Sequence, residues 1–148
     1  MRLFLLSLLF IPLPANAQWS TFDHDGREYA SICSDDADET CVYLTCEGNT
    51  PSFSLVSLGA WAVKIGDEYP MFLSIGGGGV RDLEGEVEAA AGFGPEFFAI
   101  SAKIGPEQVT LLKEQMAFAV GLSNGELWTF NLRGSGAALS SALAQCGS

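Results

Sequence analysis

The chain has 148 residues, and its 18 acidic and 7 basic side chains give a formal net charge of −11 at pH 7. Nucleic acids and anionic membranes bind proteins mainly through lysine and arginine, so this charge argues against both kinds of partner. The same charge keeps the protein soluble and would attract cationic partners.

The first 17 residues, MRLFLLSLLFIPLPANA, have the order of a secretory signal peptide. Arg2 precedes an apolar run, and small residues at 15–17 suit the peptidase. The run is about a dozen residues long, whereas a membrane-spanning helix needs roughly 20. We predict cleavage after Ala17, a periplasmic or secreted location, and a single domain over residues 18–148 without a membrane span. Because Arg2 is removed, 18 acidic and six basic residues remain, and the formal charge becomes −12.

Four cysteines lie in the exported part of the chain: Cys33, Cys41, Cys46 and Cys146. An oxidising compartment favours two disulfides, for which three connectivities exist. Residues 41–46 alternate in side-chain type without Gly or Pro, which predicts a strand. The two ends of this strand would lie about 16 Å apart, too far for a bond between Cys41 and Cys46.

A partner strand over residues 28–33 would place Cys33 opposite Cys41. By strand parity, Cys46 lies on the more apolar face of its strand, which suits contact with an element packed over the core. The C-terminal segment is that element, so we predict the bonds Cys33–Cys41 and Cys46–Cys146. A redox-active pair is disfavoured because no C-x-x-C spacing occurs.

Period-two alternation predicts further strands at 53–58, 60–65, 71–75, 80–88, 97–102, 117–122 and 126–132. The strand at 80–88 would be an edge strand broken by Gly85. Asn124-Gly125 predicts a hairpin turn between the last two strands.

Two short helices are expected in the second half of the chain. Pro106, at a first helical position, predicts a helix over 106–115. Ser135 would cap a second helix, whose apolar side ends at Cys146. The sequence therefore predicts a mainly β fold, an antiparallel sandwich or flattened barrel with two short helices packed on it.

The stretch SDDADETC at 34–41 holds four closely spaced acids: Asp35, Asp36, Asp38 and Glu39. Calcium takes six to eight oxygen ligands, and an EF-hand loop needs twelve residues with a glycine at its sharp turn. This stretch is shorter and lacks that glycine. We interpret it as a solvated turn closed by a disulfide, with a weak surface calcium site as the alternative.

Few residues suit catalysis. His24 is the single histidine, whereas zinc enzymes usually need several imidazoles or thiolates, and no G-x-S-x-G elbow occurs, so we interpret His24 as an exposed turn residue. Glu84, Glu86 and Glu88 alternate and would share one face of the edge strand, where charge discourages aggregation. A glycosidase pair there is the alternative. We expect no catalytic residue, no metal site and no cofactor.

Residues 130–146, FNLRGSGAALSSALAQC, resemble the C-terminal element of a broad group of small exported alphaproteobacterial proteins of unknown function. In that group a last strand, a Gly-Ser turn and an Ala-Leu-rich helix end in a cysteine. The stretch also loosely resembles the end of the invasion-associated locus B family, although the later cysteine pair of that family is absent here. The resemblance implies an exported protein with a disulfide-bonded β-rich domain.

The sequence favours a non-enzymatic domain that binds an envelope component or a host protein. A second hypothesis is an acidic inhibitor of a cationic cell-wall hydrolase of the lysozyme type, which a negative surface would attract. A third is a carboxylate-dependent hydrolase, which would need two carboxylates in one pocket and a perturbed pKa.

Overall fold

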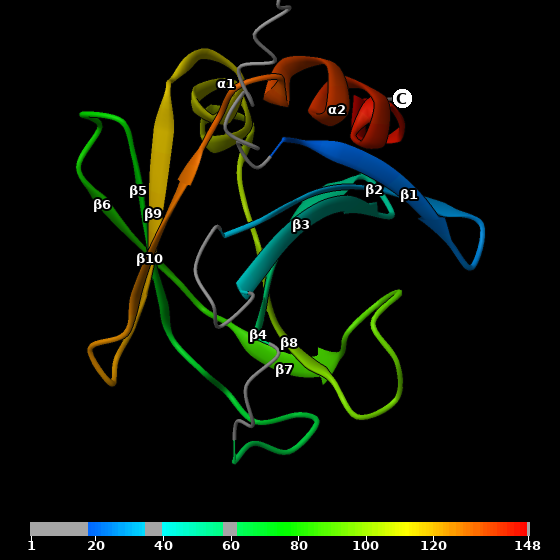
Figure 1. Cartoon of the computed structure of the whole chain (residues 1–148), viewed down its shortest axis with the longest axis vertical. Coiled ribbons are helices and arrows are strands. Elements are labelled where there is room, and N and C mark those ends of the chain that lie inside the picture. The colour runs from blue at the N-terminus through cyan, green and yellow to red at the C-terminus, as the bar shows by residue number, and fades with distance from the viewer. Residues whose placement is uncertain (1–17, 35–39, 58–61, 148) are drawn as a thin grey trace, which may run out of the picture.

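The computed structural model describes residues 18–34, 40–57 and 62–147. Its strands form two antiparallel sheets, with two α-helices and a short 3₁₀ turn after the second helix (Figure 1). The predicted signal peptide, the acidic residues Asp35–Glu39 and Trp61 lie outside the described residues.

The larger sheet has six strands in the order β1-β2-β3-β4-β8-β7. These are β1 (Ser20–His24), β2 (Arg27–Cys33), β3 (Thr40–Glu47), β4 (Thr50–Ser57), β8 (Phe98–Lys103) and β7 (Glu86–Ala89). Every neighbouring pair is antiparallel. The two central strands, β3 and β4, are the longest, and most of their residues are buried.

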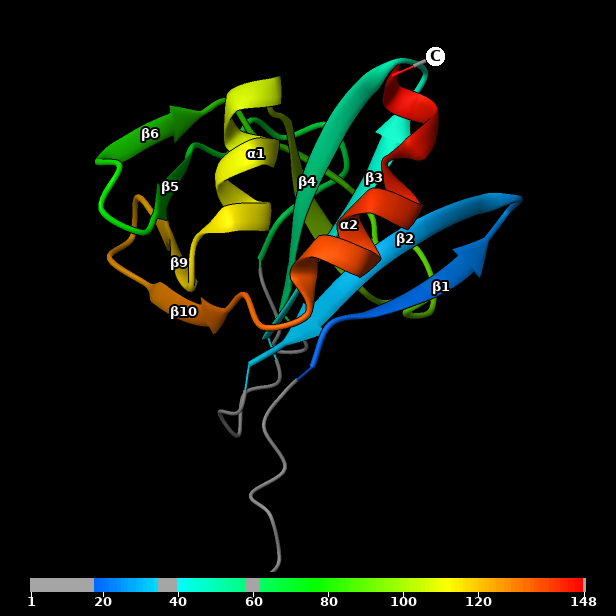
Figure 2. The same cartoon turned by 90° about the horizontal axis from the view of Figure 1, so that it is seen from above.

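The smaller sheet has four strands in the order β10-β9-β5-β6. These are β10 (Leu127–Asn131), β9 (Ala117–Leu122), β5 (Met71–Ile75) and β6 (Val80–Leu83). Figure 2 shows the two sheets splayed around a shared interior. The prediction of a mainly β fold with antiparallel sheets and two short helices is confirmed, and no closed barrel forms.

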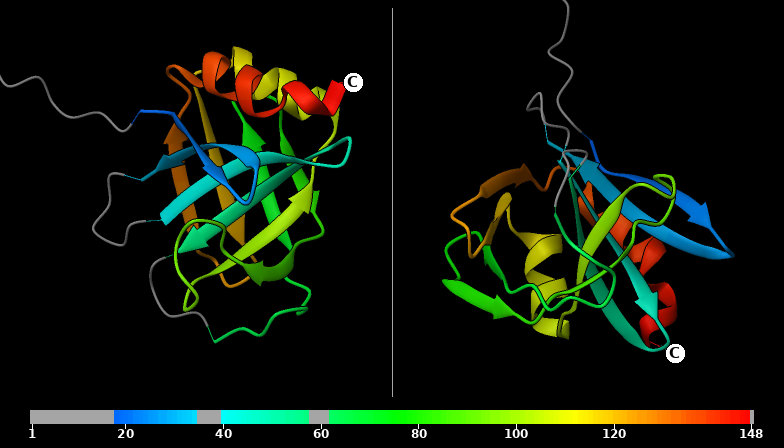
Figure 3. Two further views of the ribbon diagram at one scale, coloured as in Figure 1. Left: turned by 90° about the vertical axis from the view of Figure 1, so that its right-hand side faces the viewer. Right: turned by 90° about the horizontal axis from the view of Figure 1, so that it is seen from below.

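The helices α1 (Pro106–Glu114) and α2 (Ser135–Ala142) lie side by side over one end of the sheets (Figure 3). α2 packs mainly on β2, with further contacts to β1 and β3. No helix in the described part of the chain is long and apolar enough to cross a membrane. The 3₁₀ turn Ala144–Gly147 then carries Cys146 to β3.

The main core lies between the sheets because the longer strands have one apolar face. On β4, Phe53 and Leu55 point inward and are fully buried, and on β5 Met71 and Leu73 do the same. Leu139 of α2 completes this cluster. Burial of these side chains is the main source of stability.

Both disulfides of the chain have the partners that the sequence analysis predicts. Cys33 and Cys41 lie directly opposite each other on β2 and β3, with Cα atoms 3.9 Å apart. Cys46, which is 5% exposed on the core face of β3, bonds to Cys146 with Cα atoms 5.5 Å apart. The second bond fixes the C-terminal turn to the sheet.

Three local predictions were wrong. Residues 62–65 of the predicted strand 60–65 form no strand; the chain instead runs along β7, where Glu68 bridges Glu86. The predicted strand 80–88 is two strands, β6 and β7, which belong to different sheets. Ser135 is not the cap of α2 but its first residue, and its hydroxyl donates to the Leu112 carbonyl 2.9 Å away.

Candidate functional site

The outer face of the larger sheet, which points away from the main core, carries a row of polar side chains. The strand register aligns Tyr43 of β3, Ser54 of β4, Ser101 of β8 and Glu86 of β7 across four neighbouring strands. Residues directly opposite one another in antiparallel strands share a face, so all four side chains lie on this outer surface.

A directed chain of hydrogen bonds runs along this row. The Ser101 hydroxyl donates to Glu88 Oε1 at 2.6 Å, and the Ser54 and Ser101 hydroxyl oxygens also lie 2.6 Å apart. Because a hydroxyl has one proton, Ser54 must donate to Ser101. At the far end, the Ala91 amide donates to the Tyr43 hydroxyl at 3.1 Å. The hydroxyl donors of Ser54 and Ser101 therefore point in succession toward the Glu88 carboxylate.

Aromatic side chains form a small second core beside this chain. Tyr29 stacks on Phe22 with ring centroids 4.9 Å apart, and Tyr43 meets Tyr29 edge-on at 5.2 Å. Phe93, from the segment 90–97 between β7 and β8, stacks on Tyr43 at 6.2 Å. The segment thus covers part of the outer face and leaves the remainder open.

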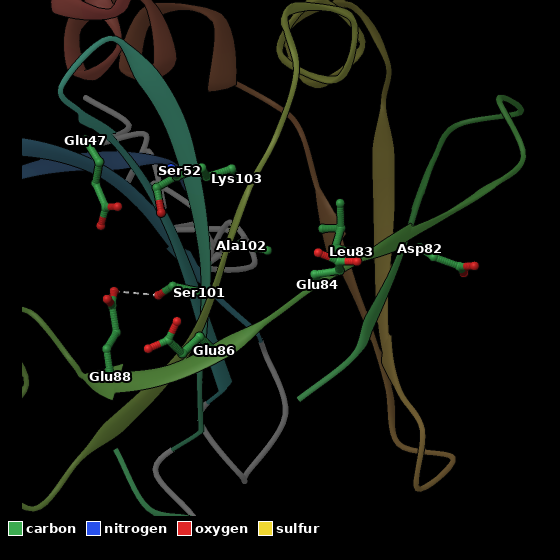
Figure 4. A pocket seen from close by; sticks show the side chains of 10 residues that line it. All are labelled: Glu47, Ser52, Asp82, Leu83, Glu84, Glu86, Glu88, Ser101, Ala102 and Lys103. Carbon is green, nitrogen blue, oxygen red and sulfur yellow. Dashed lines mark hydrogen bonds between the residues drawn. The ribbon is translucent and has the colours of Figure 1, made fainter. Parts of the chain in front are cut away.

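The open part is a hollow of about 480 Å³, which we call the acidic hollow. Ten residues line it: Glu47, Ser52, Asp82, Leu83, Glu84, Glu86, Glu88, Ser101, Ala102 and Lys103. Figure 4 shows the carboxylates of Glu47, Glu86 and Glu88 around Ser101, whereas Asp82 points away from them. With one lysine among five acids, the wall of the hollow is strongly negative.

Glu88 is the most perturbed acid in the hollow. Partial burial raises its pKa above the usual value, and the negative charges of Glu47 and Glu86 raise it further. The hydrogen bond from Ser101 lowers it but does not cancel these effects. Burial also raises the pKa of Tyr43 to about 12, so this phenol stays protonated and can donate.

A second hollow of about 280 Å³ adjoins the first and shares Glu47 and Glu88 with it. It extends over Tyr29, Tyr43 and Arg27 toward the end of β1. The Arg27 guanidinium lies 4.0 Å from the Glu47 carboxylate. Together the two hollows form one polar surface, and the tyrosines Tyr29 and Tyr43 line the second hollow.

His24 lines this second hollow, which corrects its predicted place in an exposed turn. It is the last residue of β1, pairs across the sheet with Arg27, and its side chain is 41% exposed. Its imidazole lies 3.4 Å from the Asp25 carboxylate and edge-on to Tyr29. The short, polar sequence of β1 gave no strand signal, so the strand was missed.

The three alternating glutamates have different positions. Glu86 and Glu88 belong to β7 and share its outer face, as expected, but Glu84 precedes the strand. The free side of β7 is covered by backbone bonds to residues 66–69, so these carboxylates face the hollow instead of guarding an open edge. Among the described residues, no group of three or more His, Cys, Asp or Glu side chains could hold a metal ion.

The polar row and Glu47 were not predicted from the sequence. Ser52 and Ser54 alternate on β4, which is a period-two signal for a polar outer face. Nothing in a single sequence, however, aligns β4 with β7 and β8, because these strands begin 29 and 41 residues after β4 ends. Ser54, Ser101 and Glu88 come together only because β4 pairs with β8 and β8 with β7 in this register.

The comparisons address the fold. No family model and no curated protein sequence matches the chain. The crystal structure of invasion-associated protein B from Bartonella henselae matches with a TM-score of 0.60, over 90% of this chain and 96% of that chain. The two proteins share a fold. Their sequences are 12% identical, so the likeness shows the fold alone. The likeness supports the invasion-associated locus B resemblance at the level of the fold, and it tests neither the motif at residues 130–146 nor membership of that family.

Proposed function

We propose that the protein is an exported, non-enzymatic binding domain that holds a cationic segment of an envelope or host protein in the acidic hollow. The observation that carries this proposal is the convergence of the Glu47, Glu86 and Glu88 carboxylates on one concave surface. A lysine or arginine side chain entering the hollow would meet several acceptors at once.

Export is supported by two independent features. The N-terminal segment has the order of a signal peptide, and all four cysteines are paired in disulfides, which persist in oxidising compartments. The fold shared with a bacterial invasion-associated protein fits a location outside the cytoplasm. The partner is defined here by its chemistry, a basic and accessible segment.

The arrangement of the hollow favours binding of a charged group over a purely steric fit. Glu88 is held by Ser101, which is itself held by Ser54, so this carboxylate is oriented before any ligand arrives. Preorganised acceptors lose little entropy on binding. The formal charge, −11 for the full chain and −12 after the predicted cleavage, would add long-range attraction for a basic partner.

A basic lysozyme is the first partner to test, because it represents the cationic cell-wall hydrolases. Binding measured by calorimetry at low ionic strength should weaken as salt is added, since salt screens exposed charges. The double variant Glu47→Gln/Glu86→Gln should weaken binding about tenfold, from roughly 0.2–1 kcal/mol for each exposed charge pair. The control Glu107→Gln/Glu114→Gln also removes two negative charges, from two exposed acids on α1 that lie outside the hollow.

If the two double variants, Glu47→Gln/Glu86→Gln and Glu107→Gln/Glu114→Gln, weaken binding equally, the attraction is only a general effect of net charge, and the hollow is not the site. If no basic protein or peptide binds at low salt, the proposal fails as a whole.

A carboxylate-dependent hydrolase is the second candidate, and the raised pKa of Glu88 beside Glu47 and Glu86 favours it. A protonated Glu88 could act as a general acid and a neighbouring carboxylate as base or nucleophile. The test is turnover of peptidoglycan and other polysaccharides by the wild type and by Glu88→Gln. Turnover that Glu88→Gln lowers at least about 100-fold would replace the binding proposal with a catalytic one.

A further inference from the structure

The four edge strands of the two sheets differ in how they are protected. Among the described edge strands, β1 and β6 carry the acids Asp23 and Asp82. β7 is covered on its free side, where the Val87 amide and carbonyl bond to the backbone of Asp67 and Gly66 at 2.9 and 2.8 Å. β10, with the sequence LWTFN, contains no charged residue. Uncharged, uncovered edges are templates for pairing with another strand.

Alternate residues of β10 direct their backbone groups toward β9 or away from it, and one hydrogen bond at the turn shows which residues do which. The Leu122 amide donates to the Glu126 carbonyl at 2.9 Å, so these two residues form a bonded pair. In an antiparallel ladder bonded pairs recur at every second residue. The even-numbered residues of β10 therefore bond to β9, and the backbone groups of Leu127, Thr129 and Asn131 point outward.

A contact at one end of the strand supports this phase. The Trp19 indole donates to the Asn131 carbonyl at 3.0 Å, so that outward carbonyl is already occupied. Within the described part of the chain, no other backbone or side-chain bond reaches the outward amides and carbonyls of Leu127 and Thr129.

The side chains beside this edge are neutral. Leu127 is 68% exposed and lies on the same face as Phe72, across Gly121 of β9. The nearest acid, Glu126, accepts a hydrogen bond of 2.8 Å from the Asn124 amide of the adjacent turn. Its carboxylate is therefore held toward the turn.

We propose that β10 pairs with β10 of a second copy of this chain, antiparallel and about a two-fold axis at Trp128. In this register Leu127 of each copy lies opposite Thr129 of the other. The backbone amide of each of these two residues then donates to the backbone carbonyl of the other. The two Trp128 residues then face each other at the axis. Such aromatic cross-strand pairs stabilise sheets.

The self-complementary form of this edge favours a second copy as the occupant, because Leu127 and Thr129 lie symmetrically on either side of Trp128. Two strongly negative chains repel each other least where neither presents a carboxylate, and this edge is such a place. Pairing of like edges about a two-fold axis closes the assembly as a dimer. The charge and cover on β1, β6 and β7 prevent further addition of strands.

The interface is a single strand edge, smaller than the roughly 1,200–2,000 Å² of specific stable interfaces, so we expect a reversible dimer. Added salt should strengthen it, because salt screens the repulsion between the chains. Binding of a cationic partner in the acidic hollow has the opposite salt response, so the two proposals fail independently.

Sedimentation velocity on the purified, disulfide-bonded protein tests the proposal from about 1 µM to about 1 mM, at low and high salt. Leu127→Lys places a charge at the edge, and Thr129→Pro removes an outward amide without touching the bonds to β9. Each substitution occurs twice per dimer and should raise the dissociation constant at least about tenfold. Val80→Lys is the matched control, since Val80 is 71% exposed on the opposite edge strand.

Hydrogen exchange gives a second reading in the wild type. The Thr129 amide should exchange rapidly in dilute solution and become protected as the concentration rises. A monomer at every concentration in high salt would overturn the proposal. So would a dimer that Leu127→Lys and Thr129→Pro leave intact, or one that Val80→Lys weakens equally.

Discussion

Removal of the Cys46–Cys146 disulfide should destabilise the protein far more than removal of Cys33–Cys41. The two bonds close loops of very different length, with sequence separations of 100 and 8 residues. In the chain-entropy model the longer loop gives about 4.7 kcal/mol and the shorter about 2.5 kcal/mol. The expected difference between the two double-alanine variants is therefore about 2 kcal/mol.

The pair is well matched for this comparison. Each bond joins one buried cysteine, Cys46 or Cys41, to a more exposed one, so the cavities left by alanine are similar. Urea unfolding of both variants at neutral pH, with stability extrapolated to water, measures the difference. Equal losses, or a larger loss for the Cys33–Cys41 variant, would refute the loop-length argument and would indicate strong residual structure in the unfolded chain.

Three further predictions concern single residues around the hollow and the sheet edge. Glu88→Gln should become progressively more stable than the wild type as pH rises above about 4.5, because a raised folded-state pKa makes ionisation of Glu88 unfavourable to the fold; melting temperatures between pH 4 and pH 7 measure this. Tyr43→Phe should cost about 1 kcal/mol, because the Ala91 amide loses its acceptor, and amide exchange at Ala91 should accelerate. Gly85→Ala should cost about 1–3 kcal/mol in urea unfolding, because an added Cβ would overlap the Tyr69 carbonyl oxygen.

Each of these predictions has a contradicting result. A stability difference between Glu88→Gln and the wild type that stays constant with pH would mean that burial does not perturb this acid. An unchanged exchange rate of the Ala91 amide in Tyr43→Phe would mean that this amide does not donate a hydrogen bond to the Tyr43 hydroxyl. Gly77→Ala is the control for Gly85→Ala, since its Cβ would meet no atom within 4 Å, and equal losses in the two variants would contradict the steric reason.

The local and covalent features of the fold were predictable from sequence because they depend on short-range patterns. Strand parity on 41–46 and the length of that strand lead to the observed partners of Cys46 and Cys41. Pro106 marks the first residue of α1, and Asn124-Gly125 marks the turn between β9 and β10.

Features that depend on which distant strands meet were not predictable. Gly85 was expected to break one strand, yet it separates strands of two sheets, because its backbone lies against the Tyr69 carbonyl and the Ile100 side chain. Met116 follows the buried Leu112 of α1 by four residues, which is the spacing of one helix face. It nevertheless lies beyond the end of α1 and is 79% exposed. The acidic hollow required the register of β3, β4, β8 and β7, which local patterns do not encode.

An NMR titration of the disulfide-bonded protein with a short lysine-rich peptide tests most directly whether the acidic hollow is a binding site. The account predicts that chemical shifts change first at Glu47, Glu86, Glu88 and Ser101, that β10 is unaffected, and that the changes disappear at high salt. Shift changes spread over all exposed acids, or gathered elsewhere on the surface, would contradict it.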